Sequence, residues 1–190
     1  MKVGTDGVLL GAWTDVASCN NILDVGTGTG LISLMLAQRN LNARIVAIDI
    51  DADCIVQATE NIDQSPFAKQ ISVQKISFQD FKCSSKTRFD LIVSNPPFFQ
   101  NSLQSPDISR SCARHDTTLS YKDILTAADS LLNEQGKVAF ILPSDLKEKA
   151  IEDASKVNLS PSRITHVFPL PHKPVKRILI ELVKSTTSTA

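Results

Sequence analysis

The sequence predicts an α/β protein built on a doubly wound, mostly parallel sheet of seven strands that ends in a C-terminal antiparallel hairpin. Short apolar runs alternate with helix-like stretches along almost the whole chain, a pattern typical of parallel strands joined by crossover helices. The last two apolar runs have only the segment 169–174, PLPHKP, as their main connection. Since a parallel crossover needs about a dozen residues or more, these two runs are expected to pair as a hairpin.

The first half of the chain contains four of the predicted strands. The runs NILDV, RIVAI and FDLIV are short and apolar, whereas ISVQK alternates apolar and polar residues. The stretch LISLMLAQ is expected to form a mostly buried helix, and the next helix carries apolar side chains at helical spacing. The strands are 21–25, 44–48, 71–75 and 89–93, and the helices are 31–38 and 52–62.

The second half continues the alternation and completes the sheet. Ile124, Leu125 and Ala128 fall on one face of a helix that ends near a glycine. We expect a single domain over 1–184, and a disordered tail over 185–190 because this end is rich in Ser and Thr. The predicted elements are helix 119–132, strand 137–142, helix 144–154 and strands 164–168 and 177–183.

Composition and charge exclude several classes of protein. With 20 Lys and Arg against 20 Asp and Glu and a hydrophobic content of 42%, the chain is neither disordered nor able to coat nucleic acid by bulk charge. No apolar run reaches the length of about 18 residues that a membrane span needs. The net charge of zero is the sum of an acidic first half and a basic second half of the chain. A local basic face is therefore compatible with this composition.

The four cysteines and three histidines show no metal-ligand spacing. The cysteines are far apart and form no CxxC pair, so we expect neither a zinc site nor a redox pair. Scattered thiols fit a reducing compartment, which predicts a cytoplasmic protein without a membrane partner or a metal.

A glycine-rich turn lies between the first strand and the first crossover helix. It reads Asp24-Val-Gly-Thr-Gly-Thr-Gly-Leu31, and glycines at this place allow positive φ and close approach of a ligand to the backbone. The spacing is GxGxG, whereas a dinucleotide fingerprint would have GxGxxG. Asp49 ends the second strand, where a carboxylate can accept both hydroxyls of a ribose. An adenosine-type ligand is therefore expected.

The second candidate motif follows the strand FDLIV. It is Ser94-Asn-Pro-Pro-Phe-Phe99, at the carboxyl edge of the sheet where ligands bind. Two prolines stiffen the loop and remove two backbone donors. Asn95 adds a side-chain carbonyl, and Phe98 adds a flat ring.

The glycine turn resembles the first motifs of class I S-adenosylmethionine (SAM) methyltransferases, which have a Rossmann-like fold. The resemblance implies that the glycines cradle SAM, that Asp24 lies near its amino-acid end and that Asp49 holds its ribose. An acidic residue common after the third strand is here Ser77, so the residue that holds the cofactor adenine is left open between Ser77 and Asp80. The expected cofactor-binding residues are Thr5, Asp24, Gly26, Gly28, Gly30, Asp49, Ser77 and Asp80.

The second motif is similar to the (N/D)PP(Y/F/W) motif of methyltransferases that modify planar amino groups. By this resemblance Asn95, Pro96, Pro97 and Phe98 are the expected catalytic residues. The Asn95 amide oxygen and the Pro96 carbonyl each accept one amine hydrogen, so that the nitrogen lone pair points at the methyl group, and Phe98 stacks on the base. No strong general base is needed, because the sulfonium leaving group drives the reaction.

The opening block MKVGTDG narrows the resemblance. Together with LDVGTGTGLISLMLAQR, ENIDQSP and FDLIVSNPPFF, it closely resembles the bacterial tRNA(Val) adenine-N6 methyltransferase family, whose members are understood to methylate the adenine beside the anticodon. Members of that family have further residues before this block and beyond the last strand, so this chain is expected to cover the catalytic domain. The expected tRNA-binding residues are Lys2, Arg110, Arg114, Lys173, Lys176 and Arg177.

Three alternatives remain open on the sequence. The same motif serves enzymes that methylate bases of rRNA or DNA, or the side-chain amide of glutamine. A non-catalytic SAM- or RNA-binding module is also compatible with the sequence. An NAD-dependent oxidoreductase ranks last, because the GxGxG spacing of this chain differs from the GxGxxG spacing of a dinucleotide-binding turn. Nothing in the sequence implies an oligomer, so we expect a monomer.

Overall fold

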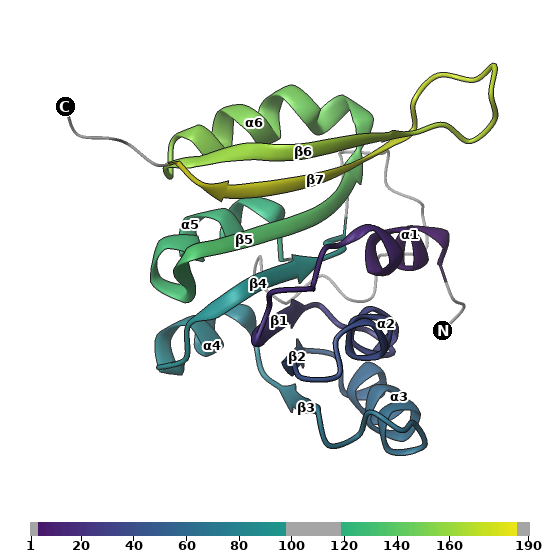
Figure 1. Ribbon diagram of the computed structural model, residues 1–190, viewed down its shortest axis with the longest axis vertical. Helices are drawn as coiled ribbons and strands as arrows, with labels where there is room; N and C mark the ends of the chain where they lie inside the picture. The colour runs from purple at the N-terminus through teal and green to yellow at the C-terminus, as the bar shows by residue number, and fades with distance from the viewer. Residues whose placement is uncertain (1–3, 98–118, 186–190) are drawn as a thin grey trace, which may run out of the picture.

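The computed structural model describes residues 4–97 and 119–185, and it confirms the predicted fold class. One seven-stranded sheet has the order β3-β2-β1-β4-β5-β7-β6 (Figure 1). Neighbours from β3 to β5 are parallel, whereas β7 runs antiparallel to both β5 and β6. The strands are β1 (Asn21–Val25), β2 (Arg44–Asp49), β3 (Ile71–Lys75), β4 (Phe89–Ser94), β5 (Leu132–Pro143), β6 (Leu159–Val167) and β7 (Arg177–Lys184).

Helices cover both faces of the sheet, as a doubly wound fold requires. In Figure 1, α1 to α3 lie on one side of the sheet and α4 to α6 lie on the other. Each layer buries its own apolar cluster against the sheet, one centred on Leu36 and Ile62 and the other on Phe140 and Leu125. The helices are α1 (Thr5–Trp13), α2 (Leu31–Arg39), α3 (Ala52–Asp63), α4 (Phe78–Ser84), α5 (Tyr121–Leu131) and α6 (Lys147–Ser155), which follows the 3₁₀ turn η2 (Ser144–Leu146).

Strands β5 and β6 differ most from their predicted bounds, and both contain irregular pairing. Strand β5 begins at Leu132, where it pairs with Phe89, and its register against β4 shifts before the next pair, Leu91 with Lys137. The intervening residues resemble a turn in sequence but belong to the strand. Strand β6 begins at Leu159 and has a register shift next to Pro161. It is an edge strand, and an edge position tolerates a proline that lacks a backbone donor.

Helix α4 has no counterpart among the elements predicted from the sequence. It begins after Ser77, whose hydroxyl accepts from the backbone N–H of Asp80 at 3.0 Å. Phe78 and Phe81 are buried, and Phe81 packs on Phe89 with ring centroids 6.1 Å apart. The helix is only one and a half to two turns long, so its local signal is weak and its aromatic packing stabilises it.

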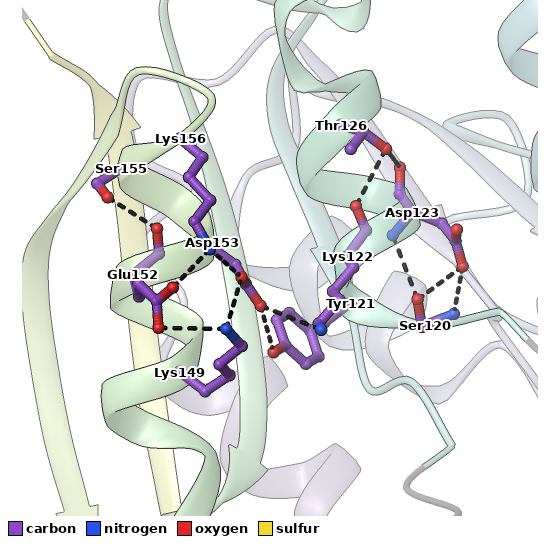
Figure 2. A network of polar contacts seen from close by, with 10 residues as sticks. All are labelled: Ser120, Tyr121, Lys122, Asp123, Thr126, Lys149, Glu152, Asp153, Ser155 and Lys156. Carbon is purple, nitrogen blue, oxygen red and sulfur yellow. Dashed lines mark hydrogen bonds and ion pairs between the residues drawn. The ribbon is translucent and has the colours of Figure 1, made fainter.

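A polar network joins α5 to α6 on one face of the molecule (Figure 2). The Tyr121 hydroxyl donates to Asp153 Oδ2 at 3.0 Å, and Lys122, Lys149 and Lys156 place their Nζ atoms 3.3–3.4 Å from the same carboxylate. Burial would raise the pKa of Asp153, but the Tyr121 hydrogen bond and the lysines lower it to about 2. The carboxylate therefore stays charged and links the two helices.

Helix α1 is fastened to the sheet at both ends. At its C-terminal end, Trp13 Nε1 donates to Thr165 Oγ1 at 2.9 Å, and the Arg163 guanidinium lies 3.9 Å from the centroid of the Trp13 ring. At its N-terminal end, Arg177 Nε donates to Asp6 Oδ2 at 2.8 Å. These contacts join the first helix to the C-terminal hairpin, although the two elements are far apart in the sequence.

Within residues 4–97 and 119–185, no helix has the length and apolar character that crossing a membrane would demand.

Candidate active site

A cavity of about 390 Å³ opens at the carboxyl ends of β1, β2, β3 and β4. Parallel strands end at one edge of a sheet, and the order of strands reverses beside β1, so this is where an α/β fold binds ligands. Its size is that of a small-molecule site. The lining residues are Val25, Gly26, Gly28, Ile48, Asp49, Ile50, Cys54, Ile76, Phe78, Gln79, Asn95, Pro97 and Leu119.

The glycine turn forms the floor of this cavity. Gly26 and Gly28 line it with φ values of +71° and +58°, which a residue with a Cβ rarely adopts. The backbone N–H groups of Gly26 and Thr27 both donate to the Ile48 carbonyl, at 2.9 and 3.0 Å, which holds the turn against the end of β2.

Gly30 plays a different part from the one expected. It is buried, does not line the cavity, and has φ +80° at the start of α2. A Cβ at this position would lie 3.2 Å from Ile62 Cδ1. A glycine is therefore needed at position 30 because α2 packs closely on α3 there. This packing sets the direction in which the turn leaves the sheet.

Asp49 reaches across the cavity from the end of β2. Its Oδ2 accepts from the Gly28 N–H at 2.9 Å, and its Oδ1 accepts from the Asp51 N–H at 3.0 Å. A carboxylate offers about four acceptor positions, so two remain for ligand hydroxyls. The side chain is half-buried and lines the cavity, as the ribose assignment requires.

Asp24 lies behind the turn and is completely buried. Its Oδ2 accepts from Thr27 Oγ1 and Ser33 Oγ, both at 2.7 Å, whereas its Oδ1 has no hydrogen-bond partner among the described residues. Burial raises the pKa of Asp24 to about 6, although the two hydroxyl donors lower it. An anionic carboxylate with one free oxygen is a suitable neighbour for a cationic group.

The far end of the cavity differs from the prediction for Ser77 and Asp80. Ser77 Oγ donates to Asp80 Oδ2 at 2.7 Å, and both residues cap α4 instead of lining the cavity. Sequence reasoning missed the residues that do line this end. They are Ile50, Cys54, Ile76, Phe78 and Gln79. All but Cys54 are sequence neighbours of Asp49, Ser77 or Asp80, the polar residues predicted to bind the cofactor.

The second motif borders the same cavity. Asn95 and Pro97 line it, while Pro96 between them is buried. The hydroxyl of Ser94, immediately before Asn95, donates to the Val25 carbonyl at 2.7 Å, and Val25 and Ser94 are also register partners. The end of β4 is thereby held beside the glycine turn, which brings the two motifs together.

The remaining predicted residues are spread around this edge or are not described. Lys2, Phe98, Arg110 and Arg114 lie outside the described residues. Thr5 is exposed at the start of α1 and does not line the cavity. Lys173 and Lys176 are exposed in the β6–β7 connection, and Arg177 is half-buried in its ion pair with Asp6.

The residues present fit SAM. Two positive-φ glycines admit a ligand close to the backbone, Asp49 offers acceptors to a ribose, and the unpartnered Oδ1 of buried Asp24 suits a ligand that carries positive charge. Ile50, Ile76 and Phe78 provide apolar walls for a planar base. No group of three or more potential metal ligands occurs in the part of the chain that the structure describes.

Comparison with solved structures places the fold among methyltransferases. A predicted O-methyltransferase from Agrobacterium tumefaciens superposes with a TM-score of 0.71 at 18% identity, covering 96% of this chain and 82% of that one. A ribosomal protein L11 methylase from Lactobacillus delbrueckii superposes with a TM-score of 0.67 at 21% identity, covering 94% and 77%. At these identities the similarity establishes the fold alone.

Comparison of sequences is more specific. A model of the methyltransferase small domain matches residues 7–158. A tRNA1(Val) (adenine(37)-N6)-methyltransferase from Parabacteroides distasonis is 53% identical over 182 residues, which cover 96% of this chain and 76% of that protein. The corresponding protein from Trichodesmium erythraeum is 47% identical over 186 residues, 97% of this chain and 78% of the relative. The chain therefore belongs to the methyltransferase small domain family and to its bacterial tRNA1(Val) adenine-N6 methyltransferases, which use SAM as methyl donor.

Proposed function

We propose that the chain transfers the methyl group of SAM to the exocyclic N6 amine of an adenine in tRNA, adenine 37 of tRNA1(Val), and that it does so in the cytoplasm as a monomer. The observation that carries this proposal is the meeting of two motifs in one cavity. Gly26, Gly28 and Asp49 line it from β1 and β2, and Asn95 lines it from β4. The relatives named above support the choice of substrate.

On the cofactor side, the proposal assigns each part of the cavity to a part of SAM. Asp49 binds the ribose, Gly26 and Gly28 pack under the chain that joins ribose and amino acid, and Asp24 balances the positive charge from behind the turn. Gln79 takes the adenine-recognition role in place of Ser77 and Asp80, because Gln79 lines the cavity while the Ser77 and Asp80 side chains cap α4.

On the substrate side, Asn95 and Pro96 position the target amine. The Asn95 amide oxygen and the Pro96 carbonyl each accept one hydrogen of the amine, which favours a pyramidal nitrogen with its lone pair free. Bound SAM supplies an electrophilic methyl group with a good leaving group, so these residues need to orient the amine and need not deprotonate it beforehand. Phe98 would stack on the target base, which must leave its stack to enter the cavity.

The tRNA backbone is expected to cross the basic residues around this edge. Lys2, Arg110, Arg114, Lys173 and Lys176 would contact phosphates, and Arg177 would act through its ion pair with Asp6, which joins the hairpin to α1.

The test is methyl transfer from labelled SAM to unmodified tRNA, combined with two variants that separate binding from catalysis. Asn95→Ala should lower the transfer rate about 100-fold or more while SAM binds as in the wild type. Asp49→Asn should weaken SAM binding about 10- to 100-fold, since it removes a charged acceptor. Asp51→Asn, a matched change at the exposed cap of α3 outside the cavity, should leave both properties unchanged.

The alternatives have distinct outcomes in the same assay. Transfer to a glutamine peptide or to DNA without transfer to tRNA would overturn the substrate assignment. If the wild type transfers no methyl group to any of these substrates, and Asn95→Ala leaves SAM and RNA binding unchanged, the chain is a non-catalytic binding module. Mass mapping of the methylated nucleoside identifies the modified position.

A further inference from the structure

The β6–β7 loop, residues 168–176, exposes two large apolar side chains. Phe168 is 54% exposed and Leu170 is 59% exposed. Phe168 is the one aromatic side chain among the large exposed apolar residues of the described part of the chain. Together, an exposed aromatic ring and a second exposed apolar side chain two residues away offer a contact surface to a partner.

The loop presents these side chains in a fixed form. Its ends are closed by a hydrogen bond from the Lys176 N–H to the Val167 carbonyl at 3.0 Å, and an inner turn by one from the Lys173 N–H to the Leu170 carbonyl at 3.0 Å. Ser144 Oγ donates to the Val175 carbonyl at 2.8 Å, which ties the loop to the end of β5. Three prolines (169, 171 and 174) restrict the backbone further. A partner would therefore meet a preorganised surface, which lowers the entropic cost of binding.

The residues of the loop itself carry only positive charge. The sequence has no Asp or Glu from 154 to 180, and Lys173 and Lys176 are exposed. Within the described residues, neither lysine side chain has a hydrogen bond or ion pair. Free cations beside an exposed ring fit a polyanion that offers flat apolar faces, which is the chemistry of RNA with unpaired bases.

The position of the loop relates it to the cavity. Arg177 at the start of β7 pairs with Pro143 at the carboxyl end of β5 and with Val167 at the end of β6. The loop consequently projects from the sheet edge at which β4 delivers Asn95, and Figure 1 shows it extending beyond the strands. Phe168 follows the end of β6, and two strands, β5 and β7, lie between β6 and β4. Three strand spacings of about 4.8 Å therefore give a lateral separation of about 14 Å.

We propose that Phe168 is a base-stacking platform for an unpaired nucleotide close to the methylated adenine, with Lys173 and Lys176 binding phosphates of the same strand. The target adenine leaves its stack when it enters the cavity, and its neighbours in the single-stranded loop are then free to stack on an aromatic side chain. The proposal rests on the proposed function, because it takes the substrate to be RNA.

The test compares Phe168→Ala with Phe168→Trp in the full chain. The readouts are kcat and KM for an unmodified tRNA anticodon stem-loop, the affinity for the same RNA by fluorescence anisotropy, and SAM affinity by calorimetry. Phe168→Ala should weaken RNA binding and raise KM for RNA about tenfold, without a change in SAM affinity. Phe168→Trp should keep wild-type values because it preserves a stacking face.

Val56→Ala is the matched control, since Val56 is 58% exposed on α3 and far from the loop in sequence. It should leave both binding affinities unchanged. A Lys173→Gln, Lys176→Gln double variant should lower the slope of RNA affinity against salt concentration by about two phosphate contacts.

The outcomes separate this proposal from the proposed function. Wild-type turnover on tRNA tests the function itself. Equal RNA affinity of the wild type and Phe168→Ala would overturn the stacking role, whether or not tRNA is methylated. A loss of SAM affinity in Phe168→Ala that matches the loss of RNA affinity would also overturn it, because the side chain would then act on the fold.

Discussion

At the scale of single residues, Asp24 shows how burial and function oppose each other. Its carboxyl group is completely buried, and one oxygen lacks a partner among the described residues. Because burial raises its pKa to about 6, the charged form is present at neutral pH at a cost to stability. Such a group is well suited to attract a cationic ligand, and a neutral residue would not do so.

Asp24→Asn should change the pH dependence of stability in a defined direction. Because the folded pKa lies above the unfolded value, the folded state binds the extra proton between about pH 4 and pH 6, so wild-type stability falls as pH rises through this window. The asparagine carbonyl can still accept from Thr27 and Ser33. Relative to the wild type, the variant should gain about 2 kcal/mol between pH 4 and pH 7, as measured by urea unfolding without ligand.

Asp129→Asn is the matched control, because the Asp129 side chain is 93% exposed. Its unfolding free energy should follow that of the wild type at both pH values. If the unfolding free energy of Asp24→Asn also equals that of the wild type at both pH values, burial does not penalise the charged form of Asp24, and this account is wrong.

At the scale of elements, the α5–α6 network determines how one helical layer holds together. Tyr121 is buried, packs edge-on against Phe140 with ring centroids 6.4 Å apart, and donates its hydroxyl to Asp153. This residue therefore connects the apolar core to the charged network of Figure 2. The neighbouring lysines are exposed and contribute less, since water screens them.

Tyr121→Phe should keep the ring and lose the hydrogen bond, which costs about 1 to 2 kcal/mol of unfolding free energy at pH 7. Because the pKa of Asp153 is held at about 2 in the folded state, this contribution is present above about pH 4 and is lost as pH falls toward 2. The difference between wild type and variant in urea unfolding should therefore shrink below pH 4. Lys122→Gln, which removes a 54% exposed partner, should cost less; an equal or larger loss would contradict this account.

At the scale of the whole molecule, the cavity depends on strands that only the complete sheet brings together. It is lined from the ends of β1, β2 and β4 and from the residues that follow β3. A ligand that binds there binds the folded state alone. Saturation with SAM should therefore stabilise the entire domain and should do so cooperatively.

At a SAM concentration of about 100 Kd, the stabilisation should be about 2.7 kcal/mol, which raises Tm by about 5 to 10 °C for a domain of this size. Differential scanning fluorimetry measures this shift. NADH at the same concentration should produce none, because the GxGxG turn lacks the dinucleotide spacing. A shift with NADH and none with SAM would point to the oxidoreductase alternative.

Much of the fold is readable from the sequence because its signals are local. The strand 21–25 and the strand 71–75 are predicted with the bounds that the structure has, since apolar runs between turns need no distant partner to be recognised. Helix α4 is missed because seven residues carry little periodicity. The predicted start of strand β6 is five residues late, because the tolerance of Pro161 depends on β6 being at the edge of the sheet.

The sequence by itself determined the α/β class, the glycine turn, Asp49 and the Asn95 motif, because each of these is a residue pattern at a strand end. Only the tertiary structure decided which side chains share the cavity. It placed Gln79 at the cavity, moved Gly30 into the packing of α2 on α3, and tied Arg177 to Asp6. These outcomes depend on contacts between residues as far apart as 6 and 177, and the local sequence carries no information about such contacts.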